Sequence, residues 1–180
     1  MGMKKIEYKH KNRFSAVLLL TMLFITLCVY GAGRNRIDRS TVKQLDLKSF
    51  MGRWYELARF DHRFERDMTN VMTEYRLLDD GTVEVINIGI RDGKEHRATG
   101  HAKTTTEAGR LRVSFFWKFY SDYNIMEMAE DGSWVLVGSR SPEYLWILSR
   151  QPSLPDSTMQ HIIELARKRG YAVENLILAK

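Results

Sequence analysis

Cysteine is nearly absent from this chain of 180 residues, since Cys28 is the only one. A disulfide needs two thiols, so none can form within the chain, and an exported domain must be stabilised by its apolar core. The length suits one domain with a sizeable core and is short for two. The length therefore predicts a single domain, and the scarcity of cysteine predicts that its apolar core stabilises it.

Motifs of hydrolytic, redox and zinc chemistry are also absent, because Gly-x-Ser-x-Gly, Cys-x-x-Cys and His-Glu-x-x-His occur nowhere in the chain. The five histidines are scattered. His96 and His101, five residues apart on one expected strand, would face opposite sides of a sheet. We therefore expect no metal site, no cofactor and no catalytic residue, and we expect the protein not to be an enzyme.

A block of like charge is lacking outside the first residues. The net charge is +6, and residues 1–13 supply +4 of it through five basic side chains against Glu7. Beyond them, acidic and basic residues are interspersed, whereas a nucleic-acid face needs Lys and Arg clustered on the fold. We expect no nucleic-acid partner.

Charge is missing altogether from residues 14–33. A basic leader, this apolar run and the small residues at 31–33 are the three parts of a secretory signal. The run is also long enough to cross a bilayer as an uncleaved anchor. Residues 1–33 are therefore expected to be a signal peptide or a membrane anchor. Cys28 is a candidate lipidation site, although Leu27 stands where such a site has a small residue.

The remaining chain begins with a polar, charged segment at 34–46 that lacks a sustained period, which indicates a tether before a folded domain at 47–180. Short runs of β-branched and aromatic residues then recur, with turn residues between them. Several alternate strictly between apolar and polar side chains, as residues 111–115 do. The eight candidate strands are 54–60, 71–78, 82–88, 96–103, 111–116, 123–129, 134–138 and 144–149.

Eight antiparallel strands leave exposed edges unless the sheet closes, and a closed barrel of eight strands can hold one small ligand. A filled two-sheet sandwich is the alternative that the strand count leaves open. After the strands, apolar residues from Met159 to Ala166 fall at helical spacing, which predicts an amphipathic helix on the outer wall. Residues 176–178 are a candidate extra strand.

Five motifs follow one another along the chain, at residues 52–56, 60–66, 113–116, 123–124 and 144–150. Through these motifs the chain resembles the lipocalin family, and within it the bacterial outer-membrane lipocalins. The resemblance implies an all-β fold, an eight-stranded antiparallel up-and-down barrel with a C-terminal α-helix packed on its outer wall and an apolar ligand inside. It also implies an exported protein of the outer membrane or periplasm, held there by its leader or a lipid anchor.

The two ends of such a barrel are distinguishable from the strand order. Trp54 begins the first strand and Arg150 ends the last, so both lie at the closed end. There the guanidinium can cover the indole in a cation–π contact of about 0.5–2 kcal/mol. Gly52 allows the tight bend before Trp54. We expect Gly52, Trp54 and Arg150 to form the floor.

The opposite end is the mouth, formed by the loops 61–70, 89–95, 117–122 and 139–143. Cations at this rim are expected to reach a carboxylate or phosphate, or else to be merely solvated. Period two assigns the inner wall, and a slip of one residue in any strand would reverse the assignment. The expected rim cations are Arg63, Arg66 and Lys118, the throat residues are Trp117, Phe119 and Tyr120, and the wall residues are Phe60, Tyr75, Val85, Asn87, Ala98, Val113, Phe115 and Tyr123.

An acyl chain suits this space, because about 16 methylenes at roughly 0.8 kcal/mol each give about 12 kcal/mol of gross transfer. Association and ordering cost about 4–15 kcal/mol. We therefore expect the protein to bind, carry or store a fatty acid or lysophospholipid at the bacterial cell envelope. The alternatives are a structural or interaction protein of the outer membrane and a carrier of a tetrapyrrole-like pigment. The aromatic mouth is compatible with a homodimer.

Overall fold

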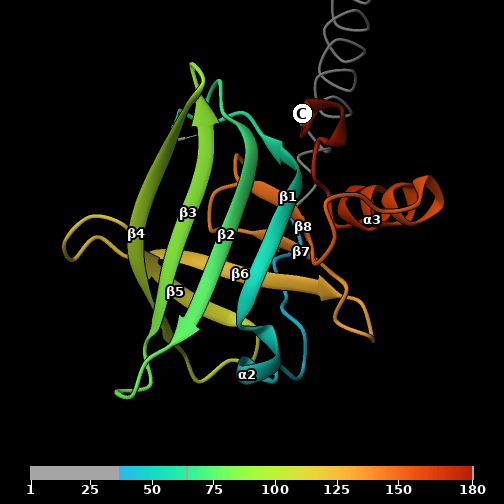
Figure 1. The fold of residues 1–180 in the computed structure, drawn as a ribbon. Coiled ribbons are helices and arrows are strands. Elements are labelled where there is room, and N and C mark those ends of the chain that lie inside the picture. Colours follow the sequence, from blue (N-terminus) through green and yellow to red (C-terminus); the bar gives the residue numbers. More distant parts are fainter. Residues whose placement is uncertain (1–36, 64, 180) are drawn as a thin grey trace, which may run out of the picture. The chain divides into compact units, whose positions relative to one another are not determined.

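The computed structural model describes residues 37–63 and 65–179 (Figure 1). The expected leader and Cys28 lie outside these residues. The elements, in chain order, are α2 (Leu47–Phe50), β1 (Gly52–Phe60), β2 (Thr69–Leu77), β3 (Val83–Arg91), β4 (Lys94–Thr104), β5 (Arg110–Ser114), β6 (Ser121–Met128), β7 (Trp134–Gly138), β8 (Leu145–Ser149), α3 (Asp156–Lys168), the 3-10 helix η1 (Val173–Asn175) and β9 (Leu176–Leu178).

The strands form one closed antiparallel sheet, which confirms the expected barrel over the sandwich. Their order is β2-β3-β4-β5-β6-β7-β8-β1-β9, and β1 also pairs with β2 (Figure 1). The first residues of β1 pair with β2 and its later ones with β8, so β1 closes the barrel. The short strand β9 adds to β1 beyond the eight strands of the barrel. Short hairpin links between neighbouring strands account for this simple order.

The barrel interior contains one of two apolar cores. Trp54 is opposite Thr73 across β1 and β2, so Thr73 and Tyr75 share its inner face. The register carries this face round the sheet to Asn87 and Val85 of β3 and on to β4 and β5. The large buried residues of this core include Phe50, Trp54, Val83, Val85, Leu111, Val113, Ile125, Val135 and Leu148.

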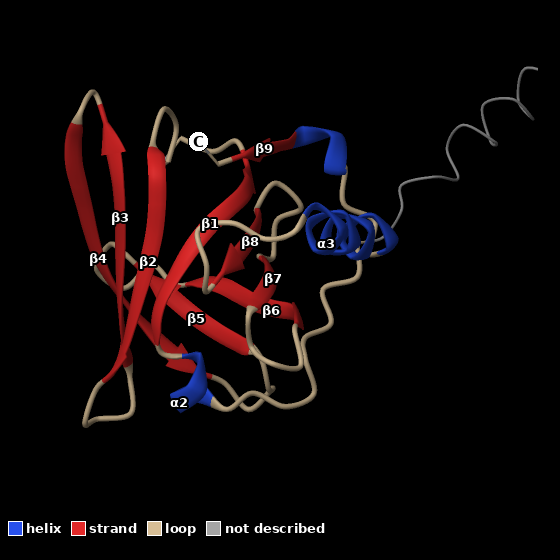
Figure 2. Cartoon of the chain, turned by 45° about the vertical axis from the view of Figure 1, so that its right-hand side comes forward, coloured by secondary structure: helices blue, strands red, loops and turns tan. Residues whose placement is uncertain are grey.

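The second core lies outside the barrel, beneath α3 (Figure 2). Ile162 and Ala166 of α3 are fully buried against the outer faces of Leu136 and Ile147. The amphipathic spacing thus serves packing, as expected for a helix whose apolar stripe faces a sheet.

Within the described ranges, no helix is both long and apolar enough to cross a membrane.

Phe60 belongs to the outer core, so its assignment to the inner wall is wrong. A bulge between Glu56 and Ala58 shifts the register of β1 against β8. The extra residue reverses the alternation, so Arg59 turns inward while Ala58 and Phe60 turn outward. The Phe60 ring then lies 6.2 Å from that of Tyr171, centroid to centroid.

Residues 37–46 pack on the barrel, whereas the sequence predicts a tether there. Thr41 is buried, and its hydroxyl donates to the backbone oxygen of Ala108 over 2.5 Å. The Val42 amide donates to the Ile125 oxygen over 3.0 Å. Val42 and Leu45 also pack against the inner core. Such scattered contacts leave no periodic signal in the sequence. The compact unit of the barrel accordingly begins at Ile37.

Candidate functional site

The floor of the barrel is built around Trp54, which is 1% exposed. The Arg150 guanidinium carbon lies 3.8 Å from the centroid of the indole. Arg150 also donates to the backbone oxygens of Arg53 over 2.9 Å and Ser49 over 2.7 Å, which fixes the guanidinium in place. The indole nitrogen donates to the Phe50 oxygen over 2.9 Å, so α2 is tied under the barrel.

Gly52 precedes this floor with a φ of +91°. A side chain at this position would meet the Arg150 guanidinium only at an ordinary distance of 3.6 Å. The left-handed backbone, and not lack of space, therefore requires glycine there. Gly52 and Trp54 lie at the start of β1, and Arg150 contacts both. This end of β1, next to α2, lies opposite the β3–β4 turn (Figure 1).

The inner wall above the floor is mainly apolar. It contains two pairs of polar side chains, and the two members of each pair hydrogen-bond to each other. The hydroxyls of Tyr75 and Tyr123 lie 2.7 Å apart, and burial raises the pKa of both phenols. Thr73 donates to the side-chain oxygen of Asn87 over 2.9 Å. Buried polar groups that are already paired do not need a polar ligand. The wall therefore presents mainly hydrocarbon, including the predicted Val85 and Val113.

Ala98 and Phe115 lie higher on the wall, where it opens to solvent. Ala98 is opposite Asn87, and so shares its inner face, but is exposed. Phe115 is 44% exposed. Its ring lies 2.8 Å from the position that a side chain on Gly100 would occupy, so Gly100 makes room for it. The predicted wall residues other than Phe60 thus lie on the inner face.

A buried group of charged residues sits inside the barrel near the mouth, which the sequence analysis did not predict as a unit. We call it the inner charge cluster. Arg59 donates to the Glu56 carboxylate over 2.7 Å and to the backbone oxygen of Glu65 over 2.8 Å. The Glu65 carboxylate lies 3.0 Å from Nε2 of His62 and accepts from the Trp146 indole over 3.2 Å. The β1–β2 loop is thereby attached to the inner wall.

The two carboxyl groups of the cluster differ in their protonation. Burial, with the neighbouring charge of Glu65, raises the pKa of Glu56 from 4.5 to about 8. Burial acts on Glu65 in the same direction, but the hydrogen bonds of His62 and Trp146 hold its pKa below the usual value. Glu56 therefore holds its proton more tightly than an exposed carboxyl group does, whereas Glu65, which is held by His62 and Trp146, is the more acidic of the two.

Replacing Glu56 by glutamine is expected to remove a pH dependence of folding. The unfolded chain gives up the Glu56 proton near pH 4.5, whereas the native state keeps it to about pH 8. The contribution of Glu56 to the free energy of unfolding is thus complete below 4.5 and is lost as the pH rises through 8. Urea unfolding at several pH values in this window should show wild type weakening with pH and Glu56→Gln weakening less.

Glu65 does not interfere with this measurement, because its pKa is lowered and its contribution to the free energy of unfolding changes with pH in the opposite direction. Its contribution is present above pH 4.5 and is lost only as the pH falls below that value. If the free energy of unfolding falls equally steeply with pH in wild type and in Glu56→Gln, the buried proton is not on Glu56.

The loops of the mouth differ from the expected arrangement. Arg66 is paired with Asp61 over 2.9 Å at the surface, and Arg63 is exposed. Trp117 and Phe119 are 78% and 69% exposed, so they do not line the throat as predicted. The reason is the backbone of Trp117, whose φ of +48° turns the β5–β6 loop outward. Figure 1 shows this loop extending beyond β4.

Tyr120 and Lys118 complete this loop. The Lys118 ammonium lies 5.8 Å from the centroid of the Trp117 indole, and that of Lys103 lies 5.2 Å from the Tyr120 ring. Tyr120 is half-buried and is the one member of the predicted throat that is partly covered.

No group of three or more His, Cys, Asp or Glu side chains arranged for a metal occurs among the described residues.

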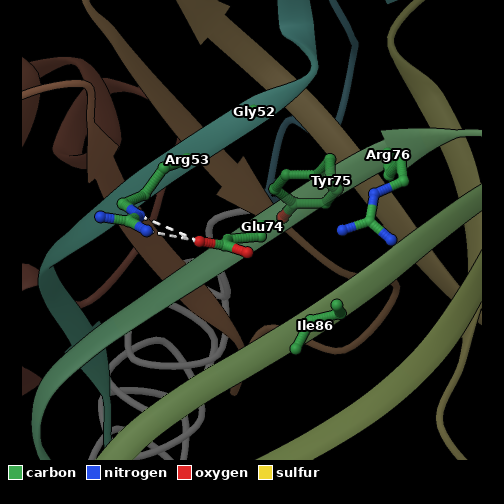
Figure 3. A pocket seen from close by; sticks show the side chains of 6 residues that line it. All are labelled: Gly52, Arg53, Glu74, Tyr75, Arg76 and Ile86. Atoms are coloured by element: carbon green, nitrogen blue, oxygen red, sulfur yellow. Dashed lines mark hydrogen bonds and ion pairs between the residues drawn. The ribbon is translucent and has the colours of Figure 1, made fainter.

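Two surface pockets accompany the barrel. One, of about 310 Å³, lies at the floor end and is lined by Gly52, Arg53, Glu74, Tyr75, Arg76 and Ile86 (Figure 3). Arg53 and Glu74 form an ion pair of 2.7 Å within it. The other, of about 380 Å³, lies between the β5–β6 and β7–β8 loops at the mouth end. We call it the rim pocket, and it contains Arg112 and Arg140.

The closed eight-stranded barrel, with a tryptophan floor and a helix against its outer wall, defines the lipocalin class of proteins. A family model described as a lipocalin-like domain matches residues 45–180. The chain belongs to this family, whose barrels hold small hydrophobic ligands.

Relatives of known name agree with this assignment. The outer membrane lipoprotein Blc of Citrobacter freundii is 39% identical over 145 residues, which cover 78% of this chain and 82% of the relative. Temperature-induced lipocalin-1 of Arabidopsis thaliana is 31% identical over 150 residues, which cover 77% of this chain and 81% of the relative. Among solved structures, insecticyanin from the tobacco hornworm Manduca sexta superposes with a TM-score of 0.66 at 18% identity, covering 79% of this chain and 84% of that one. This last likeness concerns the fold alone.

Proposed function

We propose that the barrel binds one acyl ligand, a fatty acid or a lysophospholipid, and carries or stores it at the cell envelope. The observation that carries this proposal is the pairing of the polar wall residues with each other. Because Tyr75 bonds Tyr123 and Thr73 bonds Asn87, the part of the wall outside the inner charge cluster offers mainly hydrocarbon contact. A flexible hydrocarbon chain gains most from such a surface.

The polar end of the ligand is assigned to the mouth. The floor is closed by Trp54 and Arg150, and the Arg150 donors already serve two backbone oxygens. At the other end Ala98 is exposed, so the wall there is open to solvent. A charged head group keeps its hydration at the mouth, whereas burying it at the floor would require a charged partner.

The protein is exported to the outer membrane or periplasm, as its Blc relatives, named outer membrane lipoproteins, indicate. We further propose that residues 1–33 act as the signal peptide or anchor that brings it there, with Cys28 as the candidate lipidation site. Mass determination of the mature protein from membrane fractions tests this assignment. A chain with an unmodified Cys28 would exclude lipidation.

Ligand binding inside the barrel is tested by blocking it at Ala98. Ala98→Trp places a large side chain on the inner face where the wall is open, so little core packing is disturbed. Thr99→Trp is the matched control, because the neighbouring residue of a strand faces outward. We expect Ala98→Trp to weaken binding of palmitate or lysophosphatidylethanolamine by about tenfold or more and Thr99→Trp to leave it unchanged.

Tryptophan fluorescence is the readout for the wild type, with each lipid below its micellar concentration. Because both variants add a tryptophan, their binding is compared with that of the wild type by native mass spectrometry. Trp146 is part of the inner charge cluster and adjoins the barrel core, so it reports on ligand within the barrel. Equal binding by the two variants would contradict an internal site. A visible absorption band in the purified protein would instead indicate a pigment.

A further inference from the structure

Three aromatic side chains are exposed together on the β5–β6 loop. Phe116, Trp117 and Phe119 are 73%, 78% and 69% exposed, and we call them the aromatic tip. The rings of Phe116 and Phe119 are stacked at 6.2 Å, with Trp117 edge-on to Phe119 at 6.5 Å. Their exposed area is roughly 500 Å². Apolar patches of this size on soluble proteins are usually interaction sites.

The loop holds these aromatics outward by specific contacts. The Ser114 hydroxyl lies 3.3 Å and 3.2 Å from the backbone oxygens of Phe116 and Trp117, close enough to donate to them. The Phe119 amide donates to the Phe116 oxygen over 3.2 Å. Trp117 adopts a φ of +48°, which a bulky residue rarely does. Backbone strain of this kind concentrates at functional sites, so the outward display is a built feature.

Basic and hydroxyl groups lie beside the aromatic tip. Lys118 is on the tip, and the segment from Phe115 to Ser121 contains no acidic residue. The rim pocket adjoins the same loop and brings Arg112 and Arg140 together with Ser121, Ser139 and Ser141. Arg112 is paired with Asp122 at 3.3 Å, and Arg140 is exposed. Guanidinium and hydroxyl groups in a small pocket are suited to a phosphate group.

We propose that the aromatic tip and the rim pocket dock the folded barrel on a phospholipid bilayer. The aromatic rings lie at the level of the lipid head groups, where amphipathic rings are favoured. Lys118 extends towards the head groups, and a lipid phosphate occupies the rim pocket beside Arg140. Docking in this way places the mouth of the barrel against the membrane. This contact is separate from the leader and from the ligand site.

A second copy of the chain fits this surface less well. A stable symmetric dimer buries about 800 Å² on each partner, more than the tip exposes. Pairing two identical faces would also bring together two surfaces that each carry Lys118 and Arg140. An anionic lipid surface instead complements these charges.

Vesicle flotation tests the proposal with the chain beginning at Arg34, since residues 37–180 form a compact unit with cores of their own. Vesicles contain phosphatidylethanolamine and phosphatidylglycerol, and a second set contains phosphatidylcholine alone. We expect Phe116→Ser with Trp117→Ser to reduce partitioning by about tenfold or more on both sets. Leu178→Ser, an exposed apolar residue on β9, is the matched control and should partition as wild type does.

The charged part of the surface is tested separately. Arg140→Gln should weaken binding to the anionic vesicles several-fold, while the same change at the exposed Lys43 should not. Quenching of the tip tryptophan by brominated lipid should be seen in wild type and lost in Trp117→Phe. Circular dichroism confirms that each variant is folded. A folded wild type that does not float, tip variants that float equally, or a tip-dependent dimer by sedimentation without flotation would each overturn the proposal.

Discussion

Trp54→Ala is expected to lower the free energy of unfolding by about 3–5 kcal/mol, as large-to-small changes of a buried tryptophan do. The side chain is 1% exposed and fills the floor between α2 and Arg150. Its removal leaves a cavity next to Phe50, whose ring centroid lies 5.2 Å away. It also removes the donor to the Phe50 oxygen and the surface on which the guanidinium lies. Urea unfolding followed by circular dichroism measures the loss.

Trp54→Phe separates these contributions. A phenyl ring keeps much of the packing and the cation–π contact but cannot donate to the Phe50 oxygen. We expect this variant to lose about 1–3 kcal/mol, the cost of leaving a buried acceptor unpaired together with a small cavity. If Trp54→Ala unfolds at the same urea concentration as the wild type, the floor does not stabilise the barrel.

Arg59→Met is the second large expected effect, with a loss of about 3–5 kcal/mol in the free energy of unfolding. The Arg59 side chain is 6% exposed and is the cation shared by Glu56 and the Glu65 backbone oxygen. Methionine fills a similar volume but leaves the Glu56 carboxyl without its ion-pair partner in a buried site. The β1–β2 loop also loses the bond that ties it to the inner wall.

Arg66→Met is the matched control for this change. Arg66 lies on the same loop and forms an ion pair of 2.9 Å with Asp61, but both side chains are about half-exposed. Surface pairs of this kind contribute about 0–1 kcal/mol. Equal losses in the two variants would contradict a special role for the inner charge cluster. A larger loss for Arg59→Met, with normal secondary structure, is the predicted result.

Much of the fold follows from local sequence patterns. The alternation of residues 111–115 predicts that Leu111 and Val113 share a face, and the register of β5 and the inner core confirm this for both residues. The meeting of Trp54 and Arg150 follows from strand order alone, because antiparallel first and last strands share the closed end. Helix α3 follows from its apolar spacing.

The inner charge cluster and the mouth loops did not follow from such patterns. The bulge at Glu56 and Ala58 leaves no sequence signal that period-two reading detects, and it moved Phe60 out of the barrel and Arg59 into it. Glu65 turns inward because Trp146, distant in sequence, supplies a donor. The outward turn of Trp117 depends on a single backbone angle. Tertiary contacts, and not local propensity, decide these features.

Counting bound lipid by native mass spectrometry tests the central claim most directly. The chain beginning at Arg34 is stripped of lipid, shown to be folded, and mixed with palmitate or lysophosphatidylethanolamine below the micellar concentration. We expect one acyl ligand per barrel, saturating in the micromolar range, with occupancy lost in Ala98→Trp and kept in Thr99→Trp. Absence of any bound lipid in the folded protein, or occupancy that rises without saturation, would contradict an acyl-binding barrel.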